Sequence, residues 1–304
     1  MYTKSYKAKI LLFGEYTVIN GSHALAMPIS QYSGNWADSN NEQSISLLPN
    51  LNAFVDYLDN LDKTRNLDSD LDIQRFKQQI QKGLYFKSNI PFGYGAGSSG
   101  ALCAAVFERF SKTAISIPSN EDLPDLRKKL AQLEGFYHGS SSGLDPLVSL
   151  INKPILIHPN SNSIVQIPSE GNSGGVVFLL DTGIKRKTEP FVELFLKKRE
   201  NEDFLRICED LSSLNENAIN LFLNGHSKEL LDIVHEISSL QLKHFIEMIP
   251  KNFIPIWKNG LNNNLYKLKL CGAGGGGFIL GFTNDFEQTT HSISSEKLIP
   301  IYKF

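Results

Sequence analysis

The chain has 304 residues, with 30 Lys and Arg against 32 Asp and Glu and a formal net charge of -2 at pH 7. A chain of this length is long for one hydrophobic core, so we expect two domains. Its basic residues form only short clusters, such as Lys185-Arg186-Lys187, which argues against a nucleic-acid partner.

The cysteines, the histidines and the N-terminal residues exclude further classes of protein. Cys103, Cys208 and Cys271 include no CxxC pair, so the sequence predicts neither a zinc site nor a disulfide framework. The histidines show no metal-ligand spacing. The apolar run at residues 10–13 is too short for a signal peptide or a membrane span, so we expect a cytoplasmic protein without a membrane partner.

Turn residues and the period of apolar residues divide the first half of the chain into strands and helices. Strands are predicted over residues 9–13, 16–19, 84–90, 154–158 and 163–167. Helices are predicted over residues 50–61, 71–82, 98–110 and 121–137. Asn20-Gly21 is a strong hairpin signal, and a short alternating run occupies residues 44–48.

The second half follows a Gly/Ser/Asn stretch at residues 169–175, which we interpret as a linker. Long helices are predicted within residues 187–248, and strands over residues 176–181, 265–270 and 278–282, before a last helix and strand. Strands and helices occur in pairs without a regular βαβ repeat, so the pattern favours an α+β fold over a doubly wound sheet. We expect an N-terminal domain over residues 1–170 and a C-terminal domain over residues 171–304.

A glycine-rich turn, the first glycine loop (residues 93–97), precedes the helix predicted at residue 98. Gly93, Gly95 and Gly97 lead into Ser98 and Ser99. Free backbone N–H groups and the helix dipole make such a turn an anion site, and a serine in the first helical turn can reach a metal ion on bound phosphates. No lysine ends this turn as in a Walker A motif, so the chain is no P-loop NTPase.

Two carboxylates after this loop fit phosphoryl transfer. Glu134 lies near the end of a predicted helix, and Asp145 follows in the segment HGSSSGLDP, which begins at His138. One carboxylate can hold Mg²⁺ while the other accepts the proton of an attacking hydroxyl.

A second glycine loop (residues 272–277) holds five glycines between two predicted strands. Glycines weaken local structure by about 0.5–1 kcal/mol each relative to Ala, so a close backbone approach to a ligand or to the first glycine loop is the expected compensation. The motifs together predict an enzyme that moves a phosphoryl group from ATP to a hydroxyl of a small metabolite.

In their order along residues 9–277, these motifs resemble those of the GHMP kinase superfamily. The opening segment, KILLFGEYTVINGSHALAMPI, and the later GSSSGLDP are most similar to the mevalonate kinase family. The resemblance implies an N-terminal domain like ribosomal protein S5 domain 2, a C-terminal ferredoxin-like domain, and ATP between them. It also implies ATP- and Mg²⁺-dependent phosphorylation of mevalonate to 5-phosphomevalonate, in isoprenoid precursor synthesis.

The resemblance also implies a role for individual residues. Asp145 falls on the catalytic aspartate and Lys9 on the lysine paired with it. Ser99 and Glu134 fall on the Mg²⁺ ligands. The implied ATP-binding residues are Gly93, Gly95, Gly97, Ser98, Ser99, Gly272, Gly274 and Gly275. The residues implied on the substrate side are Glu15, Tyr16 and Thr188, with Lys185 and Arg186 bordering the site.

Some positions depart from the pattern of the family. Tyr16 stands where His is usual, Gly100 where Ala is usual, and Ser141 where Pro is usual. The region between the opening segment and Glu134 is also shorter than in animal members. We expect the phosphoryl-transfer chemistry to survive these changes and the acceptor pocket to differ.

Three alternatives remain open at this point. The first is another enzyme of the superfamily: a phosphomevalonate kinase, a diphosphomevalonate decarboxylase or a sugar kinase. The second is a non-catalytic ligand sensor on the same fold. The third is an NAD-dependent oxidoreductase, because Gly95 to Gly100 fits GxGxxG, with Glu121 or Asp122 as its acidic residue. The sequence leaves the oligomeric state open, a homodimer included.

Overall fold

The computed structural model describes residues 4–38, 51–68, 70–113, 118–159, 161–171, 175–293 and 296–304. The run expected at residues 44–48 and part of the linker expected at 169–175 lie outside these ranges. The strands are β1 (Tyr6–Phe13), β2 (Ala24–Asp38), β3 (Leu84–Ser88), β4 (Ile155–Ile157), β5 (Asn162–Ile164), β6 (Val176–Asp181), β7 (Tyr266–Leu270), β8 (Phe278–Thr283) and β9 (Lys297–Lys303). The helices are α1 (Leu51–Lys63), α2 (Ile73–Gln81), α3 (Ser98–Phe110), α4 (Leu123–His138), α5 (Leu144–Ile151), α6 (Glu189–Lys198), α7 (Glu202–Leu223), α8 (Ser227–His244), α9 (Ile254–Asn263) and α10 (Phe286–Ser292).

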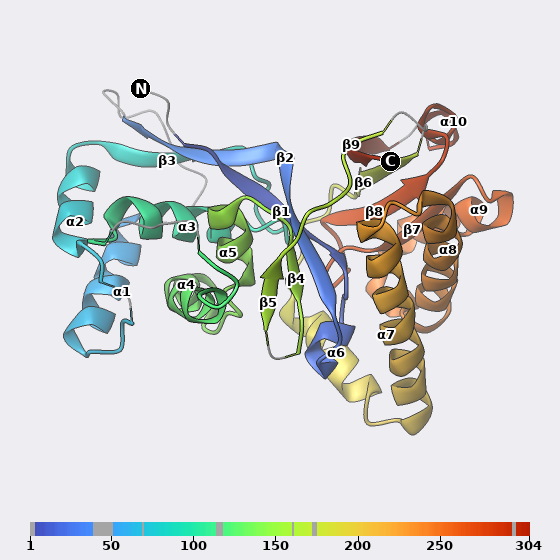
Figure 1. Ribbon diagram of the computed structural model, residues 1–304, viewed down its shortest axis with the longest axis horizontal. Coiled ribbons are helices and arrows are strands. Elements are labelled where there is room, and N and C mark those ends of the chain that lie inside the picture. Colours follow the sequence, from blue (N-terminus) through green and yellow to red (C-terminus); the bar gives the residue numbers. More distant parts are fainter. Residues whose placement is uncertain are drawn as a thin grey trace.

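The strands form two antiparallel sheets, one from each half of the chain (Figure 1). In the first sheet the order is β1-β2-β4-β5, with β3 also paired to β2. In the second sheet the order is β7-β8-β6-β9. All strand pairs among the described residues are antiparallel, which confirms the α+β prediction. The domain boundary after residue 170 stays a prediction.

Alternation along β1 explains how the first sheet meets its helices. Tyr6, Ala8, Ile10 and Leu12 are buried, because every second side chain of a strand points to the same face. The helices α3 and α5 both pack against β1. The helix α3, which follows the first glycine loop, is therefore buried along most of its length.

The strand predicted over residues 16–19 is wrong. Tyr16 has φ 64° and ψ -43°, and the amide of Thr17 donates to the carbonyl of Glu15 at 2.7 Å, which closes a γ-turn around Tyr16. A 3₁₀ helix over Thr17–Asn20 (η1) follows and ends at Gly21. The hairpin itself is formed by β1 and β2, in which Phe13 lies opposite Leu25.

Two helices that contain proline near their start were missed by the sequence pattern. The helix α5 begins at Leu144 and includes Pro146, and α9 begins at Ile254 and includes Pro255 in its first turn. Proline is well placed there, because the first turn leaves its N–H groups unbonded and proline has the helical φ already.

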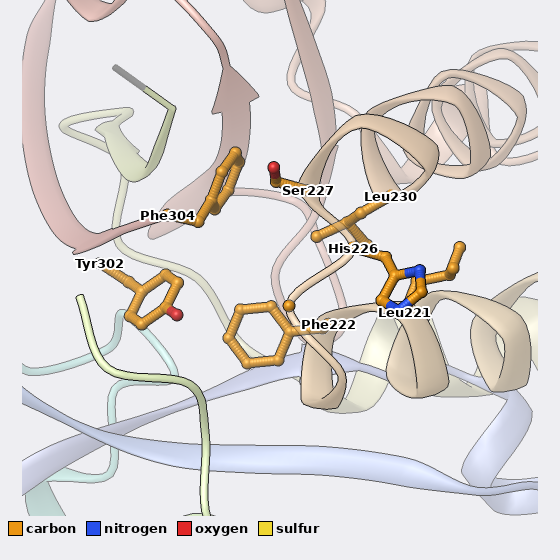
Figure 2. A pocket seen from close by; sticks show the side chains of 8 residues that line it. Leu221, Phe222, His226, Ser227, Leu230, Tyr302 and Phe304 are labelled. Atoms are coloured by element: carbon orange, nitrogen blue, oxygen red, sulfur yellow. The ribbon is translucent and has the colours of Figure 1, made fainter. Parts of the chain in front are cut away.

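Two further features lie away from the predicted motifs. An apolar pocket lies where the turn between α7 and α8 meets β9, with Phe222, Leu230 and Tyr302 among its lining (Figure 2). None of the predicted site residues lines it. Among the described helices, none has a stretch long and apolar enough to cross a bilayer.

Candidate active site

Lys9 on β1 and Asp145 in the first turn of α5 form an ion pair, with 2.8 Å between Lys9 Nζ and Asp145 Oδ1. The Lys9 side chain is 12% exposed and that of Asp145 is 28% exposed, so the pair remains accessible from solvent on the carboxylate side. The backbone N–H of Lys9 donates to the carbonyl of Ala96 at 3.0 Å. This bond ties the strand to the first glycine loop and brings the predicted catalytic pair beside the predicted phosphate site.

Gly97 and Gly100 allow this close approach of β1 and α5 to the start of α3. A Cβ on Gly97 would lie 3.0 Å from Lys9 Cγ, and a Cβ on Gly100 would lie 2.7 Å from Asp145 Cβ. Alanine at residue 100, which is usual in the family, would therefore force α3 and α5 apart here. Gly100 is the feature that lets the N-terminal ends of these two helices meet.

Glu134, in the last turn of α4, is the centre of a second polar cluster. Its carboxylate is 3% exposed and accepts hydrogen bonds from the hydroxyls of Ser99 (3.2 Å) and Ser141. Ser99 Oγ also lies 3.0 Å from His138 Nε2. Burial and then the charge of Asp145 raise the pKa of Glu134 to about 7, against the opposing effects of Ser141, Lys9 and Ser99.

The donor atoms of this cluster fit a magnesium ion that is also bound by phosphate. Among the described residues, no group of three or more His, Cys, Asp and Glu side chains forms a complete metal cage. Magnesium in phosphate-transferring sites takes one or two carboxylates and completes its shell with phosphate oxygens and water. The Glu134 carboxylate and the Ser99 hydroxyl, within hydrogen-bond reach of each other, supply that kind of ligand set.

Arg186 lies between the two glycine loops. Its backbone N–H donates to the carbonyl of Gly93 at 3.0 Å. A Cβ on Gly95 would lie 2.2 Å from Arg186 Nη2, and a Cβ on Gly272 would lie 2.9 Å from the same atom. A side chain at either residue would displace the guanidinium from this position, and the positive φ of both residues (70° and 72°) favours glycine there.

The guanidinium of Arg186 has buried donors without acceptors. Its Nε and Nη1 atoms are buried and have no hydrogen-bond partner among the described residues. Buried donors are normally paired, and a guanidinium matches the oxygens of phosphate or carboxylate in particular. An anion between the two glycine loops would satisfy these donors.

The residues predicted on the substrate side lie in different surroundings. Glu15 is 1% exposed and forms a buried ion pair with Lys269. Tyr16 is 5% exposed, and its hydroxyl donates to the carbonyl of Ala273 at 2.6 Å. Thr188 is exposed and directly precedes α6, two residues after Arg186. Their contact with an acceptor stays a prediction.

The structure thus brings Lys9, Asp145, Ser99 and Glu134 together beside the first glycine loop. Sequence reasoning gave no role to His138 and left Arg186 at the border of the site. The spacing of Glu134 and His138 was an available signal, because residues four apart on a helix lie on the same face. The buried position of the Arg186 donors had no local signal, since it depends on two loops 179 residues apart (from residue 93 to residue 272).

Known sequences similar to this chain include curated mevalonate kinases. Residues 62–153 match the family described as the GHMP kinases N terminal domain. A mevalonate kinase of Thermococcus onnurineus is 30% identical over 165 residues, which cover 48% of this chain and 48% of that protein. The match therefore spans about half the length of this relative. A mevalonate kinase of Archaeoglobus fulgidus is 24% identical over 310 residues, which cover 96% of each chain.

Solved structures share the fold over nearly the whole chain. The structure of L. major mevalonate kinase in complex with R-mevalonate matches with a TM-score of 0.64 at 16% identity, over 100% of this chain and 97% of that one. Streptococcus pneumoniae phosphomevalonate kinase, in complex with phosphomevalonate and AMPPNP, matches with a TM-score of 0.67 at 15% identity, over 99% and 100% of the two chains. The expected two-domain kinase fold is confirmed by these likenesses. Residues 62–153 thus match the GHMP kinases N terminal domain family, and nearly the whole chain shares the fold of the two solved kinases.

Proposed function

We propose that the chain transfers the terminal phosphoryl group of ATP to the primary hydroxyl of mevalonate, giving 5-phosphomevalonate. One observation carries the phosphoryl-transfer part of the proposal. The buried, unpaired donors of Arg186 lie between two glycine loops. An ion pair of Lys9 and Asp145 adjoins the first of these loops. This arrangement offers cations and backbone N–H groups to phosphate and a carboxylate to an attacking hydroxyl.

In this proposal each group of the site has one task. The first glycine loop and the start of α3 bind the phosphates through backbone N–H groups. Arg186 and Lys9 stabilise negative charge on the phosphoryl group as it moves. Asp145 accepts the proton of the acceptor hydroxyl. Magnesium, when bound to Glu134 and Ser99, neutralises charge on the phosphate oxygens.

The identity of the acceptor is supported by the curated relatives. Both the relative matched over half its length and the relative matched over 96% of its length are named mevalonate kinase. The solved phosphomevalonate kinase shares only the fold at 15% identity. A phosphorylated acceptor would need a second cationic pocket beside Asp145, whereas Arg186 already faces the two glycine loops. Mevalonate is therefore the acceptor that we propose.

The test is ADP release from Mg-ATP by the purified chain, with mevalonate, phosphomevalonate and a sugar panel as acceptors. We expect turnover with mevalonate, and we expect Asp145→Asn to lower the turnover about 10²–10⁴-fold, as the loss of a positioned base does. Asp70→Asn is the control, because Asp70 is an exposed aspartate in a surface ion pair.

Other outcomes would point elsewhere. Turnover with a phosphorylated acceptor or a sugar alone would keep the mechanism and reject mevalonate. Asp145→Asn with near-native turnover would remove the assignment of the base. ATP binding without turnover on any acceptor would favour a ligand sensor over an enzyme.

A further inference from the structure

We propose that Glu15 and Tyr16 are positioning residues, which hold the start of the second glycine loop against the opening segment and do not contact the acceptor. The inference rests on the proposed function for its kinetic consequences only. Its structural content, the fixation of residues 272–277 by two consecutive residues near the N-terminus, is independent of the substrate.

The backbone at Tyr16 is the first evidence. A γ-turn with positive φ is rare and strained for a residue that carries a side chain, and such strain persists only where surrounding contacts enforce it. At Tyr16 these contacts are made by its hydroxyl and by its ring. The hydroxyl donates to Ala273, and the ring packs on Phe195 and Phe245 at centroid distances of 4.6 and 5.7 Å.

The ion pair of Glu15 is the second evidence. Lys269, its partner, precedes the second glycine loop by three residues and is fully buried. Lys269 Nζ also donates to the carbonyls of Leu12 and Leu270, each at 3.0 Å. The ammonium group therefore joins the end of β1 to the end of β7, at the point where the chain enters the loop.

The remaining contacts of the second glycine loop show which part of it Glu15 and Tyr16 hold in place. Its later part is held by other segments: the amide of Gly275 donates to Met248 and that of Gly277 to Ile184, both at 2.7 Å. Gly272 lies at the start, against the guanidinium of Arg186. Tyr16 and Glu15 thus fix the part of the loop that forms one wall of the proposed anion site.

Burial argues against direct contact of these residues with an acceptor. Glu15 and Tyr16 are 1% and 5% exposed. Glu15 Oε1 pairs with Lys269 and the Tyr16 hydroxyl donates to Ala273, while Glu15 Oε2 is buried without a hydrogen-bond partner among the described residues. The Asp145 side chain, in contrast, is 28% exposed. The position where the family usually carries His is occupied here by a side chain long enough to reach the loop.

The experiment measures amide hydrogen exchange of residues 272–277 in Tyr16→Phe, without nucleotide or acceptor, and then the KM for ATP and for the acceptor. Because the variant keeps the ring and loses one hydrogen bond, we expect the loop amides to exchange about 5–10-fold faster. We expect the KM for ATP to rise by a similar factor, about 5–10-fold, and the KM for the acceptor to stay within about twofold.

Tyr302→Phe is the matched control. Tyr302 is 4% exposed, its hydroxyl also donates to a backbone carbonyl, that of Pro168 at 3.1 Å, and it lines the remote pocket of Figure 2. In this variant the exchange of residues 272–277 and both KM values should equal those of the unchanged protein.

Two results would overturn the proposal. One is exchange of the loop amides in Tyr16→Phe at the rate of the unchanged protein. The other is a raised KM for the acceptor with an unchanged KM for ATP, which would make Tyr16 an acceptor contact. If Tyr16→Phe does not fold, Glu15→Gln, which keeps the size of the side chain, is measured in the same way and judged by the same two results. Since exchange is measured without substrates, the outcome is decided even if the chain shows no kinase activity.

Discussion

Glu15 and Glu134 are two buried glutamates whose carboxylates have different partners. They are 1% and 3% exposed, and burial raises the pKa of both carboxyl groups. Glu15 has a buried ammonium group, that of Lys269, in direct contact. Glu134 has only hydroxyl donors, and among the described residues no cation lies within ion-pair distance of it.

The presence or absence of a cationic partner distinguishes a carboxylate with a structural role from one that is available to a ligand. Where the protein itself pairs a buried charge, removing the partner leaves an uncompensated buried charge and destabilises the fold. A buried charge without such a partner stays costly until a cation arrives from solution. Glu134 meets the second description, which is the physical reason to prefer it over Glu15 as a magnesium ligand.

The largest effect is expected from Lys269→Met, which breaks the compensated pair. Because Glu15 would be left buried and unpaired, the free energy of unfolding should fall by about 3–5 kcal/mol in urea denaturation. Glu15→Leu combined with Lys269→Met should recover most of that loss, because both charges are then gone. Lys267→Met, in the same strand, is the control, since the ammonium group of Lys267 donates to the carbonyl of Asn264 and forms no ion pair among the described residues. An equal loss in both single variants would contradict the comparison.

A smaller effect, with a pH dependence, is expected from Glu134→Gln in the absence of metal. The pKa of Glu134 is raised from 4.5 to about 7 in the folded protein, so the folded state binds the proton more tightly than the unfolded state. The stability that this proton contributes is present at low pH and is lost as the pH rises from about 4.5 to 7. The variant should therefore gain stability relative to the unchanged protein, on the order of 2–3 kcal/mol at pH 8.

Urea denaturation at pH 5, 6, 7 and 8 measures this gain. Glu209→Gln, at an exposed position of α7, controls for the loss of one negative charge. A stability difference between Glu134→Gln and the unchanged protein that does not vary with pH would show that Glu134 is not the uncompensated carboxylate.

The smallest effect is expected from Ser141→Ala. Ser141 donates to the Glu134 carboxylate and accepts from the amide of Gly143 at 3.0 Å. Losing this hydroxyl should lower the free energy of unfolding by about 1 kcal/mol and raise the pKa of Glu134 further. The check is the concentration of Mg²⁺ needed for half-maximal ADP release at pH 7, which should increase. Ser142→Ala changes a neighbouring serine whose hydroxyl accepts from the backbone N–H of Leu144, and it should leave this concentration unchanged.

The sequence predicted well those parts of the fold that depend on local pattern. The helix expected at residues 98–110 and the strand expected at 176–181 have those bounds in the structure, because glycines and apolar periods mark them. The strand predicted around Tyr16 was wrong. The apolar neighbours of Tyr16 fit a strand pattern, whereas contact with residue 273 imposes a positive φ. In the candidate site, the motif positions predicted Lys9 and Asp145. The unpaired donors of Arg186 could not be predicted in this way, because they result from packing between loops that are distant in the sequence.

The order of the second sheet has a consequence for the synthesis of the protein on the ribosome. The central strand β6 pairs with β8 and with β9, so its two neighbours emerge roughly a hundred residues after it. Until residues 278–283 have left the exit tunnel, β6 lacks both partners and exposes an apolar strand, a feature that favours aggregation of nascent chains. Premature termination before β8 would therefore yield a fragment that is not merely inactive but prone to aggregate.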